Sequence, residues 1–395
     1  MRLTRLVPAV LLLTLATACG ADRPSPPPAA PAPHWTAIQP AGILSGRLTE
    51  PEGGAGWNNG FVLAGRHTVP AAPNDRGQVN DLVSDVYFSR DGAQWTEAKP
   101  PGLHQLGHSI PVAGYRNAAY VLGSTAFNAA IWRTEDGKSW RRTLLARSRM
   151  GEALTAVAAG PHGVVVVGFD RPIPVLDNDS IDNRRFNALR VWHSADGKTF
   201  TGPETVEASG LYNGYLPKVT ATDDGFTLFG IGKDSFDQRT FSSADGTGWT
   251  EDDAGSMTGR PQALARQNDL TAVFTETGGE GSGPTAWHKS GDDDWTASHD
   301  VSPGTLPDSN VDRPAKQHVL NLTAWRGWFI ATGDSAGAAG VWLSRDAVRW
   351  DRVPVKANGL DTAANMVTLA NDTTVLLVAA PRSGSGAVKL WKNRS

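Results

Sequence analysis

The sequence predicts an all-β chain: a seven-bladed β-propeller of four-stranded blades, with the N-terminal strand completing the last blade. Two observations carry this prediction, an acidic turn motif that recurs through the chain and apolar strands that recur with it. The composition agrees, because 395 residues with 43 Gly and 26 Pro suit one large β-rich domain or two to three smaller ones. A hydrophobic content of 40% excludes wholesale disorder.

The acidic turn motif has the form Ser-x-Asp-Gly-x-x-Trp, and four copies match it closely. Their motif positions are Ser89, Asp91, Gly92, Trp95, Thr134, Asp136, Gly137, Trp140, Ser194, Asp196, Gly197, Phe200, Ser243, Asp245, Gly246 and Trp249. Two copies are degraded: one keeps Ser344, Asp346 and Trp350 without the Gly, and the other keeps Trp295 after an acidic turn. Ser and Asp side chains bond turn amides, and Gly adopts the backbone conformation that other residues resist. We therefore expect hairpin turns whose Asp residues are structural rather than catalytic.

Apolar runs form a second repeating column and predict one buried strand in each unit. They are Phe61–Gly65, Tyr120–Gly123, Val164–Gly168, Phe226–Gly230, Leu270–Thr275, Phe329–Gly333 and Val375–Ala380. An aromatic residue two places before each motif predicts the next strand, on which it fills the core: Tyr87, Trp132, Trp192, Phe241, Trp287 and Trp342. Units of four strands that recur every 45–60 residues indicate propeller blades.

The two ends of the repeat predict how the ring closes. The aromatic residues that end the motifs stand at 35, 95, 140, 200, 249, 295 and 350, which makes seven units. Trp391 fits the aromatic strand of a last unit that lacks its final strand, and His34-Trp35-Thr36 resembles such a final strand. We expect these two strands to pair, which would remove the exposed sheet edges.

The motif resembles the Asp-box, or BNR, repeat of sialidase-like β-propellers. That family's pattern is Ser-x-Asp-x-Gly-x-x-Trp, so one residue is missing here between the Asp and the aromatic. The resemblance covers nearly all of 34–395 and implies the fold. It says little about function, because the repeat is scaffolding in proteins of different activities.

The N-terminus predicts export. Arg2 and Arg5 precede an apolar stretch from Leu6 to Leu15, which is too short to span a bilayer, so 1–18 is a signal peptide. The junction Ala16-Thr17-Ala18-Cys19 resembles a bacterial lipobox, which implies lipidation of Cys19 and attachment to the extracytoplasmic side of the cell membrane. The alternative is an ordinary Ala-x-Ala cleavage site and a free secreted protein. Residues 19–33 form a Pro-rich tether, and 34–395 form the propeller.

Three insertions suggest where a ligand binds. The segments 66–84, 169–189 and 297–317 lengthen connections that all emerge on the side opposite the acidic turns, and long loops on a rigid scaffold are often functional. The candidate ligand residues in and near them are Asp170, Arg171, Asp177, Asp179, Asp182, Arg184, Arg185, Tyr212 and Tyr215. The three Asp residues of 177–182 match a calcium loop poorly, so no metal site is predicted.

The remaining residues favour binding over chemistry. The sialidase-like alternative, a glycoside hydrolase, would use Tyr212 or Tyr215 with Glu204 or Glu207, but the Arg-Ile-Pro motif of those enzymes is absent from the first unit. A single Cys excludes an intramolecular disulfide, and a net charge of −3 gives no support for nucleic-acid binding. We expect a monomeric, non-catalytic binding or scaffold protein without a cofactor, whose ligand is a protein or a glycan.

Overall fold

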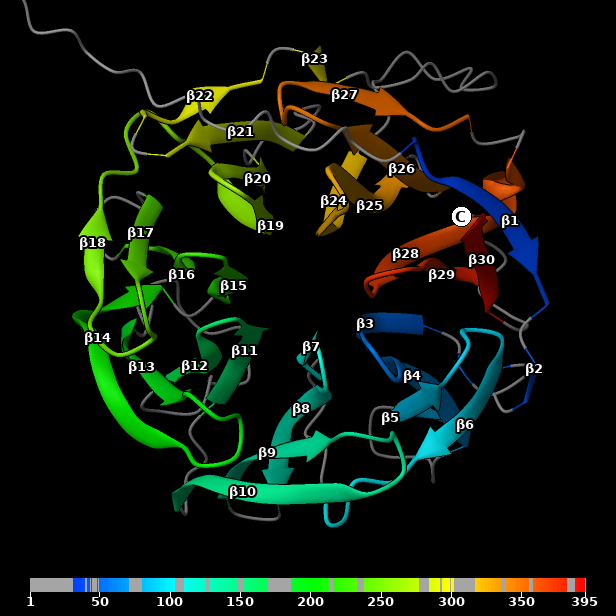
Figure 1. Cartoon of the computed structure of the whole chain (residues 1–395), viewed down its shortest axis with the longest axis horizontal. Coiled ribbons are helices and arrows are strands. Elements are labelled where there is room, and N and C mark those ends of the chain that lie inside the picture. The colour runs from blue at the N-terminus through cyan, green and yellow to red at the C-terminus, as the bar shows by residue number, and fades with distance from the viewer. Residues whose placement is uncertain are drawn as a thin grey trace, which may run out of the picture.

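The computed structural model describes most of the chain from residue 31 onward. The described residues are 31–39, 41–42, 44, 48, 50–70, 80–103, 110–125, 128–147, 153–169, 186–212, 216–232, 238–276, 284–291, 293–298, 300–301, 317–335, 338–354, 358–381 and 388–394. They form an all-β, seven-bladed propeller, in which each blade is a sheet of four antiparallel strands and the blades form a ring (Figure 1). The predicted fold class is therefore confirmed.

In every blade the first strand lies nearest the centre of the ring and the fourth lies outermost (Figure 1). Blade 1 consists of β3 (Glu50–Trp57), β4 (Gly60–Pro70), β5 (Asn80–Ser89) and β6 (Gln94–Ala98), and blade 2 of β7 (Val112–Tyr115), β8 (Ala118–Thr125), β9 (Asn128–Thr134) and β10 (Trp140–Arg147). Blade 3 consists of β11 (Ala153–Gly160), β12 (Gly163–Phe169), β13 (Phe186–Ser194) and β14 (Thr201–Tyr212), and blade 4 of β15 (Lys218–Thr222), β16 (Gly225–Ile231), β17 (Gln238–Ser243) and β18 (Thr250–Asp252).

Blades 5 to 7 repeat this arrangement. Blade 5 consists of β19 (Arg260–Gln267), β20 (Leu270–Glu276), β21 (Pro284–Ser290) and β22 (Thr296–Ala297), and blade 6 of β24 (Gln317–Trp325), β25 (Trp328–Ser335), β26 (Ala338–Ser344) and β27 (Arg349–Arg352). Blade 7 consists of β28 (Ala363–Ala370), β29 (Val375–Pro381), β30 (Lys389–Arg394) and, as its fourth strand, β1 (His34–Ile38). The seven predicted buried strands lie within β4, β8, β12, β16, β20, β25 and β29.

The ring closes as the sequence predicts. Strand β1 pairs antiparallel with β30, so that Trp35 lies opposite Asn393 and Ala37 opposite Trp391. Trp35 and Trp391 are both buried in the core of blades 6 and 7. The first strand thus hydrogen-bonds to an edge that blade 7 would otherwise expose.

The structure adds short elements that the repeat does not predict. Strand β2 (Ala41–Gly42) runs parallel to β6, and β23 (Asp300–Val301) runs parallel to β27, so blades 1 and 6 each gain a fifth strand. A single 3₁₀ turn, η4 (Leu360–Thr362), leads into β28. Within the described ranges, no helix has the length and apolar character needed to cross a membrane.

The side chains that pack between adjacent blades come from alternate positions of the second and third strands. On β4, for example, Phe61 and Leu63 face blade 7, whereas Val62 and Ala64 face blade 2. Large aromatic residues fill these interfaces, among them Trp57, Trp132 and Trp192, each no more than 1% exposed. Each interface therefore has its own small apolar core, built from two blades.

Candidate functional site

The acidic turns join the third and fourth strands of the blades, and blade 2 shows their geometry. Asp136 Oδ1 accepts hydrogen bonds from the backbone amides of Lys138 at 2.8 Å and Ser139 at 2.7 Å, and from the Thr134 hydroxyl at 3.2 Å. The Gly137 amide donates to Thr134 Oγ1 at 2.8 Å, and Gly137 has a φ of 75°. The carboxylate is thus occupied within its own turn, as its sequence position predicts.

The same hydrogen bonds recur in other blades and lower the pKa of the Asp residues. Two turn amides also donate to each of Asp91, Asp196 and Asp346. The amides of Ser139 and Lys138 lower the pKa of Asp136 to about 2, because they stabilise its charged form. In blade 6 Ala347 replaces the glycine yet keeps a positive φ of 57°.

The glycine of each intact turn also contacts the preceding blade. Gly92 lies against Leu376, Gly137 against Phe88, Gly197 against Tyr120 and Gly246 against Val165, so closely that a Cβ atom would overlap them. A turn thus seals the gap between its own blade and the previous one.

Blade 5 has a degraded turn. Lys289 and Gly291 stand where the other turns have the Ser and the Asp, and the position of the turn glycine, residue 292, lies outside the described residues. Gly291 has a φ of 54°, and a Cβ atom added to it would have nothing within 4 Å. Gly291 thus borders open space between blades 4 and 5.

This interface keeps an apolar cluster that includes Phe229, Val273 and Trp295, but beside it three positions carry Thr where the other blades carry an apolar residue. On the second strand, Thr227 of blade 4 occupies the position held elsewhere by Val62, Tyr120, Val165, Ala272, Ile330 and Leu376. On the third strand, Thr240 occupies the position of Val86, Ile131, Val191, Ala286, Val341 and Leu390. Facing them from blade 5, Thr271 occupies the position of Phe61, Ala119, Val164, Phe226, Phe329 and Val375.

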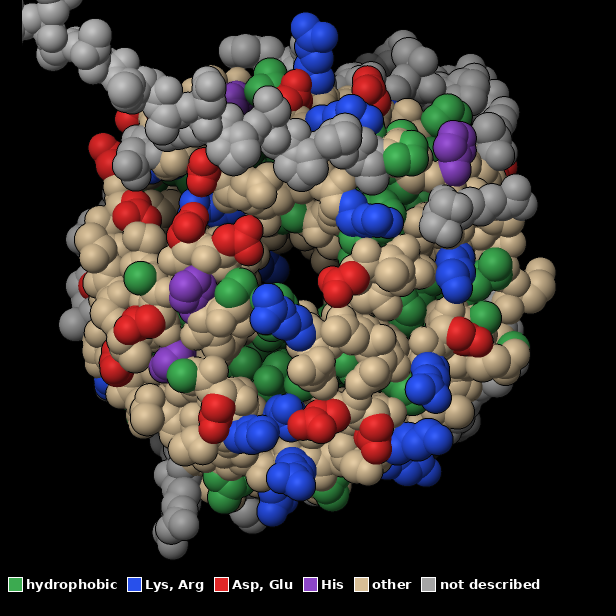
Figure 2. All heavy atoms as spheres, in the orientation of Figure 1, with side chains coloured by type: hydrophobic (Ala, Val, Ile, Leu, Met, Phe, Trp, Pro, Cys, Tyr) green, Lys and Arg blue, Asp and Glu red, His purple; other side chains and the backbone are tan. Residues whose placement is uncertain are grey.

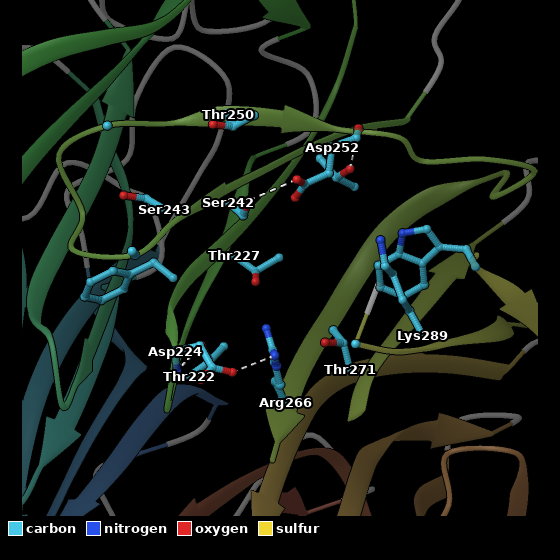
Figure 3. Close-up of a pocket in the computed structure, with 16 residues that line it drawn as sticks. Thr222, Asp224, Thr227, Ser242, Ser243, Thr250, Asp252, Arg266, Thr271 and Lys289 are labelled. Carbon is cyan, nitrogen blue, oxygen red and sulfur yellow. Dashed lines mark hydrogen bonds and ion pairs between the residues drawn. The ribbon is translucent and has the colours of Figure 1, made fainter. Parts of the chain in front are cut away.

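These changes coincide with a cavity of about 550 Å³ between blades 4 and 5, which we call the interblade cavity (Figure 3). It opens on the side of the acidic turns, since it is lined by Ser243, Ala244 and Gly248 of the blade 4 turn. Its other lining residues are Thr222, Asp224, Phe226, Thr227, Thr240, Ser242, Thr250, Asp252, Arg266, Thr271, Lys289, Gly291 and Trp295.

The charged groups of the interblade cavity are held in part by one another (Figure 3). Arg266 Nη2 lies 2.9 Å from Asp224 Oδ2, and Asp252 Oδ1 accepts the Ser242 hydroxyl at 2.9 Å. Lys289 is half-buried, and no described carboxylate lies within ion-pair distance of it. The cavity thus contains two carboxylates and two cations, a balance that suits a neutral ligand.

Several hydroxyl groups of the interblade cavity remain available to a ligand. Thr227, Thr250 and Thr271 make no side-chain hydrogen bond to a described residue, although Thr227 and Thr271 are buried. Hydroxyls donate and accept, so together with Asp252 and Lys289 they offer both kinds of partner. No described His or Cys lines the cavity.

The predicted ligand residues on the opposite side are not placed by the structure. Asp170, Arg171, Asp177, Asp179, Asp182, Arg184, Arg185 and Tyr215 lie outside the described residues, as does Cys19. Tyr212 ends β14, but its side chain also lies outside the description. The ligand face on the insertion side therefore stays a prediction.

The residues suggested for hydrolysis do not form a described Tyr–Glu pair. The Glu207 carboxylate lies 2.7 Å from Arg239 Nη2, and Arg239 also pairs with Glu251. Glu204 is exposed on β14. Within the described ranges, no three His, Cys, Asp or Glu side chains gather as metal ligands would. Sialidase-like hydrolysis stays an alternative that these contacts do not support.

Sequence reasoning missed the interblade cavity, although the signal was present. The degraded motif of blade 5 is visible in the sequence, and so are Thr227, Thr240 and Thr271. Their meaning emerges only when equivalent positions of all seven units are compared, which requires the strand register. A position that is apolar in six units and Thr in the seventh is the signal.

Comparison with known proteins identifies the architecture. No family model and no curated protein matches the chain. Among solved structures, it is similar to an acylaminoacyl peptidase of Pyrococcus horikoshii, with a TM-score of 0.55 and 9% identity over 88% of this chain and 52% of that one. A puromycin-hydrolysing peptidase of Mycobacterium tuberculosis gives 0.50 and 13% over 87% and 52%. The propeller domain of a trilobed protease from Pyrococcus furiosus gives 0.50 and 7% over 88% and 96%.

The chain spans about half the length of the two peptidases. At such low identity the likeness concerns the fold alone, and activity cannot be transferred with it. The resemblances to the Asp-box repeat and to the lipobox stay predictions. Taken with the ring of seven sheets, the comparisons establish that this chain is a seven-bladed β-propeller.

Proposed function

We propose that this chain is an exported, lipid-anchored propeller of the cell envelope that binds a hydroxyl-rich ligand, a glycan, in the interblade cavity without chemical conversion. The observation that carries the proposal is the replacement of apolar by hydroxyl side chains at one blade interface. The hydroxyls of Thr227 and Thr271 border the open space of the cavity and have no described hydrogen-bond partner. A ligand that enters the cavity can therefore hydrogen-bond to them.

The chemistry of the lining favours a sugar over other small molecules. Sugar hydroxyls donate to Asp252 and accept from Lys289, and both roles are met by the threonine hydroxyls. The balanced charge gives no preference for an anion or a cation. A volume of about 550 Å³ lies in the range of pockets that hold small molecules.

The proposed location rests on the N-terminal sequence. Arg2, Arg5 and the apolar stretch favour export, and the sole Cys of the chain, Cys19, stands at the expected cleavage point. Growth of bacteria that produce this chain in medium with a radioactive fatty acid tests the proposed lipid anchor. The wild-type chain should incorporate the label and Cys19→Ser should not; an unlabelled wild type would show a free secreted protein.

The binding site is tested by a double variant, Thr227→Val with Thr271→Val. This change keeps the side-chain shape and removes two hydroxyls that have no described partner, so the unfolding free energy should change by less than about 1 kcal/mol. Calorimetric titration with neutral envelope oligosaccharides should show binding to wild type that is weakened at least tenfold in the variant.

A matched control removes hydroxyls from another interface. Thr332 and Thr368 are buried between blades 6 and 7, and their hydroxyls lie 3.2 Å apart. Replacing both by Val should leave oligosaccharide binding unchanged. Equal affinity in wild type and in the Thr227/Thr271 variant would exclude the interblade cavity as the site.

A further inference from the structure

A second hollow lies where the central channel opens on the side of the acidic turns. Figure 2 shows the ring surface with its open centre and charged side chains of both signs near the opening. The hollow has a volume of about 280 Å³ and is formed by the turns between the first and second strands of blades 6, 7, 1 and 2. We call it the mouth hollow, and its lining residues are Gly56, Trp57, Asn58, Gly114, Tyr115, Arg116, Ala324, Trp325, Arg326, Ala370, Asn371 and Asp372.

Hydrogen bonds connect these four turns into one arc. The Trp325 indole donates to the Asn371 carbonyl at 2.8 Å, and the Asn371 side-chain amide donates to the Trp57 carbonyl at 3.5 Å. The backbone amide of Asn58 donates to the backbone carbonyl of Arg116 at 2.8 Å. The walls of the hollow are therefore fixed relative to one another before any partner arrives.

Two arginines in this arc adopt a backbone conformation that arginine disfavours. Arg116 has a φ of 42° and Arg326 a φ of 48°. The left-handed region suits Gly or Asn, and blade 5 has Asn268 with a φ of 49° in its equivalent turn. The left-handed conformation costs a residue such as Arg about 1 kcal/mol, which suggests that these two arginine side chains have a function.

The two guanidinium groups are held in position and lack anionic partners. Arg116 lies over the Tyr115 ring at 5.1 Å from its centroid, and Arg326 over the Trp325 ring at 5.6 Å. Both arginines are exposed, and neither forms an ion pair with a described carboxylate. Tyr115 is half-buried and both arginines are exposed in this rigid hollow, and Tyr and Arg are enriched at the energetic centres of protein–protein interfaces.

The chemistry of the lining separates a peptide from a sugar and from a polyanion. Trp57 and Trp325 are only 1% and 7% exposed, so neither presents an open ring face on which a sugar could stack. Asp372 lines the same hollow, and Asp223, Asp224 and Asp269 lie in the equivalent turns of blades 4 and 5. These carboxylates disfavour a polyanion, whereas a single carboxylate can pair with one of the two arginines.

We infer that the mouth hollow is a docking site for a short segment of a partner protein that inserts an Asp or Glu side chain, which pairs with Arg116 or Arg326. The inference is independent of glycan binding in the interblade cavity, because the two sites share no lining residue.

The experiment is a selection of randomised seven-residue peptides, displayed on phage, against the full chain. Enriched peptides should carry Asp or Glu, and a synthetic copy of the leading peptide should bind in a titration. Arg116→Asn with Arg326→Asn should weaken this binding at least tenfold. Asn keeps the turn conformation and removes the charge, as Asn268 shows.

Two further measurements complete the design. Arg141→Asn, an exposed arginine on β10 outside both hollows, should leave peptide affinity unchanged, and so should the Thr227/Thr271 double variant. An enriched peptide without acidic residues, affinity that survives the Arg116/Arg326 change, or a selection that enriches nothing would overturn the inference. A carboxylated sugar that binds at the arginines while no peptide does would overturn it as well.

Discussion

The interface between blades 3 and 4 and the interface between blades 4 and 5 are built from corresponding strands but differ beside the acidic turn. At the first, Gly246 of an intact turn packs against Val165 and His193. At the second, the turn is degraded, Gly291 at its Asp position borders open space, and Thr227 and Thr271 stand where other blades have apolar residues. The comparison teaches that an intact turn closes the gap between two blades, and that a cavity lies where the turn is degraded and apolar wall residues are replaced by Thr.

The largest expected effect on stability comes from removing β1, the strand that closes the ring. Deleting residues 34–40 removes β1, exposes the edge of β30 and uncovers the core around Trp391, which should lower the unfolding free energy by on the order of 5 kcal/mol. Urea melts measure it, with deletion of the tether 20–33 as the control. Equal midpoints for the two deletions would mean that blade 7 does not need its fourth strand.

A pair of glycine variants compares the intact turn of blade 4 with the degraded turn of blade 5. Gly246→Ala and Gly291→Ala each place a Cβ at positive φ, which costs about 1 kcal/mol. Only the Cβ at Gly246 meets neighbours, at 2.6 Å from Val165 and 2.7 Å from His193. We expect a total loss of about 2–4 kcal/mol for Gly246→Ala against about 1 kcal/mol for Gly291→Ala, read from chemical unfolding. Similar losses would show that the seal does not matter.

The acidic residues of intact and degraded turns should differ as well. Asp136→Ala and Asp196→Ala each leave turn amides without an acceptor and should cost about 1–3 kcal/mol. Asp293→Ala in the blade 5 turn removes an exposed carboxylate that accepts no hydrogen bond from a described residue, and should cost less than about 0.5 kcal/mol. A loss of oligosaccharide binding by a stable Asp136→Ala variant would contradict a purely structural role.

The smallest effect is a dependence on pH. Turn amides lower the pKa of Asp136 and Asp196 to about 2, below the value of an unfolded chain. Their stabilising contribution is therefore fully present above about pH 4 and is lost as the pH falls towards 2. The unfolding free energy of the double variant Asp136→Ala with Asp196→Ala should fall less steeply over this range than that of wild type. An Asp293→Ala control should follow the wild-type curve.

Much of the fold could be predicted from the sequence because each blade repeats local information. Apolar runs placed the second strands, and the positions of Trp35 and Trp391 gave the closure. The interblade cavity and the mouth hollow could not be found this way. Thr227 and Thr271 are 44 residues apart, and each by itself is an ordinary strand residue. Likewise, Arg116 and Arg326 line one hollow only because the ring brings blades 2 and 6 to the same channel.

The short outer strands beside the interblade cavity have a consequence for local motion. Strand β18 has three residues and β22 has two, and the interblade cavity takes the place of part of the apolar packing between their blades. Segments with few buried apolar contacts open at a smaller free-energy cost than the rest of a protein. Amide hydrogens of blades 4 and 5 should therefore exchange with solvent faster than those of blades 1 and 7. A bound ligand should slow this exchange, because it would fill the interblade cavity and make local opening of blades 4 and 5 less favourable.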